Sequence, residues 1–485
     1  MAFCGDHSRL TRSQLENSLG IIFRVACYFL ITREAGRAPV SLRQVIIKRR
    51  ARRRECDNPA KCHSAVFNVS PLALRYAEGR RDVIFSHQMR APNRFAHVTI
   101  LIVLVSANVF AQKLTPHHIS LANGKSFDLN LPEGYEISVA AQGLRRVRFM
   151  ALSPDNRLFV TDMYDKSDNR RGVVYILDQF DSRTRQFKKI TKYMTGLLNP
   201  NSVAFYRDLE GIDWFYLALT DQLVRYRYEA GKDAPAGEPQ VLATFPAYGL
   251  AYKYGGWHLT RTVIIGGYGK IYVAVGSSCN ACEEKEEVRA SILQMNPDGT
   301  DKKYIARGLR NAVGLRWVKG KLYATNMGSD HLGANRPADT FYALKNSETH
   351  YGWPYCFQDG PKIYFDPKFN PKGSKFNCRK VPAALTPFPA HSSPLGLEYF
   401  DADNFSDLDG SFLVALHGST TKRLGRGYRV VKVTASNGAM TDFITGFIDG
   451  IAINGRPADV FSFGKDAFLL TDDYSGVVYY IYLRR

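Results

Sequence analysis

One structural unit repeats about six times after Gln112, and this repeat most constrains the fold. Each unit has an apolar strand, a turn, a second strand with a small or acidic end, a loop and a third strand. The units begin with RFMALSPDNRLFVTDM, NSVAFYRDLEGIDWFYLALTD, HLTRTVIIGGYGKIYVAVG, RNAVGLRWVKGKLYATNMG, SPLGLEYFDADNFSDLDGSFLVALHG and RPADVFSFGKDAFLLTDD. They lie roughly 50 to 80 residues apart, as propeller blades do. The sequence therefore predicts an all-β, six-bladed β-propeller over residues 112–485, in which the early run FDLNLPEGYEISVAA could close the last blade. A β-sandwich, the alternative, gives no reason for six copies of one unit.

A polar residue leads into the first strand of every unit. These residues are Arg148, Asn201, His258, Arg310 with Asn311, Ser393 shortly after His391, and Arg456. In a propeller the starts of the first strands meet at one end of the central axis. An apolar strand does not need such leaders, and burying them without partners costs several kcal/mol each. We therefore expect a polar, cationic ring around one funnel, which is a candidate site for an anionic ligand that forms hydrogen bonds.

The net charge of +20 is spread unevenly along the chain. Roughly half of the excess lies before residue 89, concentrated in IIKRRARRREC, and the remainder of the chain is only mildly basic. A basic run of this kind is typical of a solvated tail. The charge therefore does not predict a nucleic-acid partner.

A segment with the anatomy of a secretory signal peptide begins at Met89. Arg90 and Arg94 precede a short apolar run over 98–105, and the segment ends in the A-x-A-like site VFA at 109–111. The run is shorter than the ~20 residues of a spanning helix. Because this signal peptide (89–111) is internal, we expect that translation starts at Met89 and that residues 1–88 are a non-native or disordered basic extension. An uncleaved anchor with a basic cytosolic tail is the alternative. Either interpretation places residues 112–485 outside the cytoplasm, in the periplasm or secreted.

Four cysteines follow Met89, and in an exported chain they should be oxidised. The simplest pairing is Cys279–Cys282 and Cys356–Cys378, with two other connectivities open. A zinc site that uses all four sulfurs is a competing hypothesis. Only one C-x-x-C pair is present, however, and an oxidising compartment disfavours thiolates.

Several motifs in fixed order point to a known family. They are GWHLTRTV followed by GKIYVAVG, then RGLRNAVGL, HYGWPYC, HSSPLGLEYF, HGSTTKRLGRGYRVVKV, and GRPADV followed by LLTDDYSGVVYYI. From about Phe127 onward the chain resembles the glucose/sorbosone dehydrogenase family, soluble quinoproteins that use pyrroloquinoline quinone (PQQ), and it is most similar to the sorbosone or pyranose dehydrogenase branch. The resemblance implies oxidation of a sugar (aldose, pyranose or sorbosone) at its anomeric or aldehyde carbon, with hydride transfer to the quinone. It also implies an external electron acceptor, because the sequence has no C-x-x-C-H haem motif. No stable membrane span is expected after signal cleavage.

The resemblance assigns roles to individual residues. His258 matches the catalytic base that takes the proton from the anomeric hydroxyl, and Arg310 matches the arginine that holds the quinone oxygens. The main-chain carbonyls of Gly328 and Ser329 match the calcium ligands. The remaining candidates for binding PQQ, which carries three carboxylates, are Asn311, Arg261, Lys422, Arg423 and Arg456.

One position departs from the family pattern. Classical members place an aspartate after the histidine strand to orient the base, whereas this chain has Ser277, which accepts a hydrogen bond but carries no charge. Either another acid such as Asp330 takes the role, or the proton leaves differently, or activity is reduced. The nearby EEKEEVR is expected to be a solvated loop. The Cys279–Cys282 link could instead stiffen the loop beside the site.

Two other functions remain open. A non-catalytic propeller that binds carbohydrate or protein would be consistent with the missing aspartate. A calcium-dependent hydrolase of the lactonase type would centre its ion on carboxylates and asparagines, whereas arginine and histidine dominate the predicted ring. Stoichiometric uptake of PQQ separates the quinoprotein from both alternatives.

Overall fold

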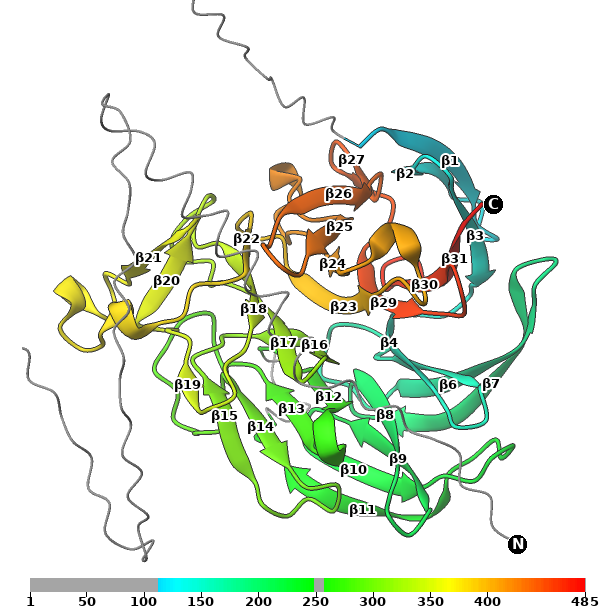
Figure 1. The fold of residues 1–485 in the computed structure, drawn as a ribbon, viewed down its shortest axis with the longest axis horizontal. Helices are drawn as coiled ribbons and strands as arrows, with labels where there is room; N and C mark the ends of the chain where they lie inside the picture. Colours follow the sequence, from blue (N-terminus) through cyan, green and yellow to red (C-terminus); the bar gives the residue numbers. More distant parts are fainter. Residues whose placement is uncertain (1–111, 248–256, 485) are drawn as a thin grey trace, which may run out of the picture. The chain divides into compact units, whose positions relative to one another are not determined.

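The computed structural model describes residues 112–247 and 257–484, which form six β-sheets arranged as the blades of a propeller (Figure 1). Each blade has four antiparallel strands, and the third blade adds a short parallel strand. The first strand of each blade packs against the first strands of the two neighbouring blades, so the ring closes around the axis. The predicted all-β, six-bladed β-propeller is confirmed.

The strands of each blade are named from the inner to the outer edge. Blade 1 has β4 (Val147–Leu152), β5 (Leu158–Asp162), β6 (Gly172–Asp181) and β7 (Gln186–Leu197); blade 2 has β8 (Ser202–Arg207), β9 (Asp213–Ala218), β10 (Gln222–Arg227) and β11 (Ala236–Thr244); blade 3 has β12 (Arg261–Ile265), β13 (Ile271–Val275), β14 (Ser291–Met295), β15 (Lys303–Arg307) and β19 (Thr349–His350); blade 4 has β16 (Ala312–Val318), β17 (Lys321–Asn326), β18 (Asp339–Ala343) and β22 (Thr386–Phe388); blade 5 has β23 (Pro394–Phe400), β24 (Ser411–Leu416), β25 (Arg429–Thr434) and β26 (Met440–Ile444); blade 6 has β29 (Pro457–Ser462), β30 (Ala467–Asp472), β31 (Val477–Leu483) and β3 (Tyr135–Ala141).

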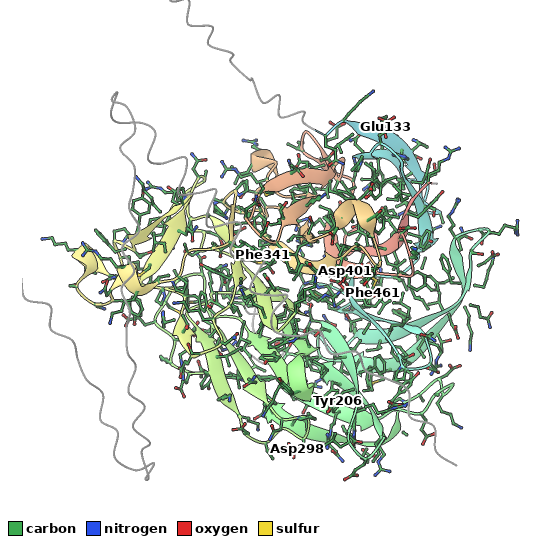
Figure 2. All side chains as sticks on the ribbon, viewed as in Figure 1. Glu133, Tyr206, Asp298, Phe341, Asp401 and Phe461 are labelled. Carbon is green, nitrogen blue, oxygen red and sulfur yellow. A yellow bond between two sulfur atoms is a disulfide. The ribbon has the colours of Figure 1, made fainter. Side chains whose placement is uncertain are left out.

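Apolar layers between neighbouring blades form the core. Side chains alternate between the two faces of a strand, and β13, with the sequence IYVAV, shows the consequence. Ile271 and Val273 pack toward blade 2, whereas Tyr272 and Ala274 pack toward blade 4. A strand that is buried on both faces therefore reads as a continuous apolar run. Figure 2 shows side chains filling the spaces between the sheets, with Phe341 in the layer between blades 4 and 5.

The last blade is closed by a strand from the beginning of the described chain. Strand β3 pairs antiparallel with β31, from Tyr135 opposite Leu483 to Ala141 opposite Val478. This pairing confirms that the run FDLNLPEGYEISVAA supplies the closing strand. The hairpin of β1 (Leu114–Ser120) and β2 (Ser126–Pro132) precedes it and lies beside β26.

Several elements go beyond the three strands predicted for each unit. Every blade has a fourth strand, and blade 4 carries an insertion with the hairpin β20 (Cys356–Asp359) and β21 (Lys362–Phe365). Short connections are the pair β27 (Ile448–Asp449) and β28 (Ala452–Ile453) and the 3₁₀ turns η1 (Gly267–Gly269), η2 (Pro371–Gly373), η3 (Cys378–Lys380), η4 (Ser406–Leu408) and η5 (Lys422–Leu424).

The four cysteines after Met89 form two disulfides, Cys279–Cys282 and Cys356–Cys378. This is the simplest of the connectivities considered. It also rules out the zinc site, because none of these sulfurs is a thiolate.

Two sequence predictions lie outside the described residues. The basic extension (1–88) and the signal peptide (89–111) both fall in the N-terminal segment and stay predictions. Within residues 112–247 and 257–484, no helical segment has the length and apolar character needed to span a bilayer.

Candidate active site

Backbone capping brings the starts of the first strands next to the ends of the second strands. In blade 1 the Asp162 carboxylate accepts hydrogen bonds from the backbone N–H groups of Arg145 and Arg146, at 2.8 and 2.9 Å. In blade 6 Asp472 accepts one from the N–H of Arg456 at 2.8 Å. These contacts explain why the second strands of blades 1 and 6 end in an aspartate. They also fix the residues that lead into the first strands.

A cavity of about 580 Å³ lies at this end of the blades. His258 and Arg310 line it from blades 3 and 4, and His391 and Ser393 line it from the approach to blade 5. The segment 419–424 contributes a further wall. Four residues that the repeat singled out therefore face one cavity.

His258 is held as a neutral base. Its Nδ1 lies 2.9 Å from the main-chain oxygen of Ser277 and 3.0 Å from the Ser277 hydroxyl. A carbonyl oxygen only accepts, so Nδ1 carries the proton and Nε2 keeps a free lone pair. Burial and the positive charge of Arg310 hold the pKa of His258 well below its ordinary value. The imidazole is therefore neutral at physiological pH.

This arrangement accounts for the missing aspartate. The Ser277 carbonyl orients the imidazole, a role that sequence reasoning gave to a carboxylate. Asp330 makes its contacts elsewhere: Oδ1 lies 2.9 Å from Nδ1 of His391, and Oδ2 lies 3.6 Å from the Arg310 guanidinium. The imidazole can thus be oriented without a charged partner.

Arg310 is fixed by three main-chain or amide oxygens. Nε donates to the Asn280 carbonyl at 2.7 Å, Nη2 to Asn280 Oδ1 at 3.0 Å, and Nη1 to the Gly328 carbonyl at 2.8 Å. The side chain lies over the ring of Trp257, with 6.0 Å between Cζ and the ring centroid. A guanidinium has five N–H donors. Nη2 also lies 3.6 Å from the Asp330 carboxylate, so the second donor on Nη1 remains for a group in the cavity.

A second charged cluster joins blades 1, 5 and 6. The Asp473 carboxylate is buried and contacts Arg148 Nη1 at 2.8 Å, His417 Nε2 at 2.7 Å and Arg146 Nη1 at 3.2 Å. Arg456 is buried beside it and donates from Nη2 to the Ser419 carbonyl at 2.7 Å. The sequence had singled out Arg148 and Arg456 but not the carboxylate that pairs with Arg148.

Lys166 adds a fourth cation to this cluster. Its side chain is exposed and interacts electrostatically with Arg456 and Asp473. Burial and the charge of Arg456 lower the pKa of Lys166 to about 8, with Arg146 and Arg148 adding to the effect. Four cations thus lie near two buried carboxylates, those of Asp473 and its neighbour Asp472. This excess of positive charge favours an anion.

The remaining predicted cofactor ligands lie in different surroundings. Asn311 is buried beside His258, and its Oδ1 has no hydrogen-bond partner among the described residues. Arg261 is fully buried, and it donates to the His258 carbonyl at 2.6 Å and to the Pro246 carbonyl at 3.3 Å. These contacts make Arg261 a support for the His258 backbone rather than part of the cavity wall.

Lys422 and Arg423 are exposed on η5. Their neighbours Thr421 and Leu424 line the cavity. The two cations therefore lie on its rim.

One of the two predicted calcium ligands, the Gly328 carbonyl, is engaged by Arg310. The Gly328 carbonyl accepts from the positively charged Arg310, so an ion at that oxygen would face a guanidinium at hydrogen-bond distance. Ser329 is buried and does not line the same cavity. Calcium at Gly328 and Ser329 stays a prediction from the resemblance, and no step below depends on it.

Sequence reasoning missed three residues of this site: Asn280, Lys166 and Asp473. Asp473 had a usable signal, since it directly follows the acidic strand end of the last unit. Asn280 lies within a C-N-A-C run, and Lys166 lies in a loop outside the repeated positions. Neither the residue type nor the spacing along the sequence marks Asn280 or Lys166 as a site residue.

The fold is thus a six-bladed propeller whose candidate site holds a neutral histidine and an arginine fixed by three oxygens. The chain is a member of the TrAA12-like family, whose model matches residues 129–444. The family resemblance found in the sequence is therefore confirmed.

Two solved structures share the fold, and one curated protein matches part of the sequence. The pyranose dehydrogenase PQQ domain of Coprinopsis cinerea, in holo form, has a TM-score of 0.58 at 18% identity, over 73% of this chain and 97% of that chain. A calcium structure of Carbohydrate-Active Enzymes Family AA12 from Trichoderma reesei has a TM-score of 0.57 at 16% identity, over 73% and 96%. An uncharacterized protein of Borreliella burgdorferi is 29% identical over 226 residues, which is 44% of this chain, and the match spans 58% of that relative's length.

Proposed function

We propose that this protein is a PQQ-dependent sugar oxidoreductase. One observation carries the proposal: His258, with its free Nε2, and Arg310, with one N–H donor on Nη1 that has no partner among the described residues, line the same cavity. Membership of the TrAA12-like family, together with a structural neighbour described as the PQQ domain of a pyranose dehydrogenase, supports it.

Cations that line the cavity or lie in the neighbouring charged cluster suit a cofactor with three carboxylates. Arg310 would hold the quinone oxygens, while Arg456 and Lys166 lie in the cluster whose positive charge exceeds its negative charge. Lys422 and Arg423, on the rim, would meet carboxylates that reach the mouth of the cavity. When bound, PQQ supplies the carbon that accepts hydride from the sugar.

His258 would act as the base. A sugar hydroxyl within hydrogen-bond reach of Nε2 would donate its proton there, while Nδ1–H stays bonded to the Ser277 carbonyl and stabilises the imidazolium. Arg310, kept in place by Asn280 and Gly328, would stabilise negative charge that develops on the neighbouring oxygen. The lowered pKa of His258 keeps the base ready for this transfer even in mildly acidic surroundings.

The expected substrate is an aldose, a pyranose or sorbosone, oxidised at the anomeric or aldehyde carbon. Electrons would pass from the reduced cofactor to a separate carrier, and the reaction would take place in the periplasm or outside the cell. A non-catalytic propeller or a lactonase-type hydrolase would differ from this proposal by taking up no PQQ.

Two substitutions test the roles. His258→Ala should abolish sugar-dependent dye reduction while the Kd for PQQ stays close to that of the unmodified chain, because the base does not hold the cofactor. Arg310→Ala should impair both measurements. His118→Ala, on the exposed hairpin β1–β2, is the control and should change neither. Near-normal turnover of His258→Ala would overturn the mechanism.

A further inference from the structure

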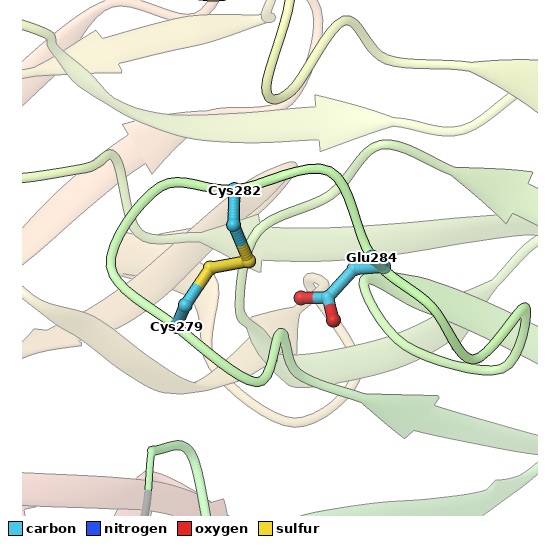
Figure 3. Close-up of side chains that lie close together, drawn as sticks. All are labelled: Cys279, Cys282 and Glu284. Atoms are coloured by element: carbon cyan, nitrogen blue, oxygen red, sulfur yellow. A yellow bond between two sulfur atoms is a disulfide. The ribbon is translucent and has the colours of Figure 1, made fainter.

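The Cys279–Cys282 disulfide closes a four-residue loop, residues 279–282, at the edge of the active-site cavity. Figure 3 shows the disulfide spanning the base of this loop, with the Glu284 carboxylate facing it. Cys279, Cys282 and Glu284 have ligand atoms within 4.8 Å of one another, but the two sulfurs are bonded to each other and do not form a metal site. The structure therefore gives this loop another role.

The disulfide loop holds Arg310. Asn280 accepts the Nε–H with its main-chain oxygen at 2.7 Å and an Nη2–H with Oδ1 at 3.0 Å. Two of the three hydrogen bonds that fix the guanidinium thus come from a single residue inside the loop. The same Oδ1 accepts the backbone N–H of Asp330 at 2.9 Å, which ties the segment after β17 to the loop.

The disulfide loop also holds the partner of His258. The Ser277 hydroxyl donates to the Cys279 carbonyl at 2.7 Å and lies 3.0 Å from Nδ1 of His258. Ser277 is fully buried, so this hydroxyl has no access to solvent. The position of the Cys279 carbonyl therefore influences the orientation of the imidazole.

Glu284 fixes Ser278, the residue that directly precedes the disulfide loop. Glu284 accepts the backbone N–H of Ser278 at 2.7 Å and its hydroxyl at 2.6 Å. This clamp, together with the disulfide, leaves Asn280 and the Cys279 carbonyl little freedom to move. The acidic run after Cys282 was expected to be only a solvated loop, and Glu284 departs from that expectation.

We propose that the disulfide loop positions both catalytic side chains, with Asn280 as the positioning residue for Arg310 and the Cys279 carbonyl, through Ser277, as the positioning group for His258. This inference rests on the proposed function for its catalytic consequence. The hydrogen bonds that position the two side chains are present without the cofactor, so this part of the inference does not depend on the proposed function. Removal of the disulfide should let both side chains depart from their productive positions at once, and a displacement of about 1 Å can cost 10²-fold in rate.

Matched pairs of variants test the proposal. The double variant Cys279→Ser/Cys282→Ser removes the disulfide loop's cross-link, and Cys356→Ser/Cys378→Ser removes the other disulfide, whose sulfurs contact neither His258 nor Ser277. We expect the first to lower kcat about 10- to 100-fold with little change in KM, and the second to leave kcat within about 2-fold.

A second pair isolates Asn280. Asn280→Ala removes one of the bonds to Arg310 and should lower kcat, whereas Asn280→Asp keeps an oxygen acceptor at the same place and should recover most of the rate. Thermal unfolding of all four variants separates this effect from general destabilisation.

The imidazole of His258 gives a readout that needs no cofactor. In ¹⁵N NMR of the apoprotein, the unmodified chain should show protonated Nδ1 and unprotonated Nε2. Loss of Cys279–Cys282 should broaden or shift these signals, and loss of Cys356–Cys378 should not. If the His258 signals and kcat are the same in both double variants, the proposal is wrong. If the unmodified chain takes up no PQQ, the proposed function fails, while the NMR comparison still decides whether the loop positions His258.

Discussion

Replacing Asp473 by asparagine should destabilise the propeller by about 3–5 kcal/mol. This carboxylate is 1% exposed and contacts Arg148, Arg146 and His417. Asparagine has nearly the same shape but no charge, so the buried Arg148 and the partly buried Arg146 would lose this counter-ion. Breaking a buried ion pair by removing one partner costs far more than losing an exposed pair.

The magnitude can be expressed as a change in Tm. Unfolding entropies of roughly 2.1 cal/mol/K per residue, taken over the roughly 370 residues of the propeller, give about 0.8 kcal/mol/K. A loss of 3–5 kcal/mol then corresponds to a decrease in Tm of about 4–6 °C. Asp128→Asn, which removes the carboxylate of the exposed pair with His118, is the control and should lower Tm by less than about 1 °C.

The assay is thermal unfolding followed by circular dichroism at pH 5 and pH 8. Although burial alone would raise the pKa of Asp473, His417 and the two arginines hold it well below its usual range. A group with a depressed folded-state pKa contributes stability that is present above its unfolded pKa and is lost only as pH falls through the folded value. The difference in Tm between the unmodified chain and Asp473→Asn should therefore be similar at both pH values. A decrease no larger than that of Asp128→Asn would refute the assignment of Asp473 as the central counter-ion.

Three further predictions concern the base, its packing and the closure of the ring. Because burial lowers the pKa of His258, the acid limb of kcat/KM should lie well below pH 6.5, and a limb at or above 6.5 would contradict a buried neutral base. In Gly276→Ala the new Cβ would lie 2.4 Å from Asn311 Oδ1 and 2.6 Å from His258 Cβ. We therefore expect the free energy of unfolding to fall by about 1–3 kcal/mol and kcat to decrease. An unchanged Tm and an unchanged kcat would argue against this packing. A chain that starts at Gln112 should unfold cooperatively. A chain that starts at Gln142 lacks β3 and should lose cooperative unfolding or fail to fold. Equal Tm values for the two chains would mean that the ring does not need the closing strand.

The six blades could be predicted because their inner three strands are buried on both faces and carry long apolar runs. Apart from β3, the outer strands could not, since β7, for example, reads KKITKYMT over much of its length and resembles a polar connection. Strand β22 has only three residues and follows the insertion that carries β20 and β21, so nothing near it in the sequence marks its place in blade 4.

The candidate site was predictable where the repeat placed it. His258 and Arg310 stand before first strands, and such positions converge in any propeller. Arg261 comes three residues after His258 and was grouped with it, but its guanidinium binds main-chain carbonyls below the site. The contacts of Asn280 depend on the conformation of a four-residue loop, which residue types alone do not specify.

Titration of the purified chain, expressed from Met89, with PQQ tests the central proposal most directly. Fluorescence would follow binding, and dye reduction would be measured over a panel of aldoses, pyranoses and sorbosone, with and without added calcium. We expect saturable uptake of one PQQ per chain, and sugar-dependent dye reduction that disappears in His258→Ala. Absence of uptake would overturn the proposed function and would favour a propeller that binds carbohydrate or protein without catalysis.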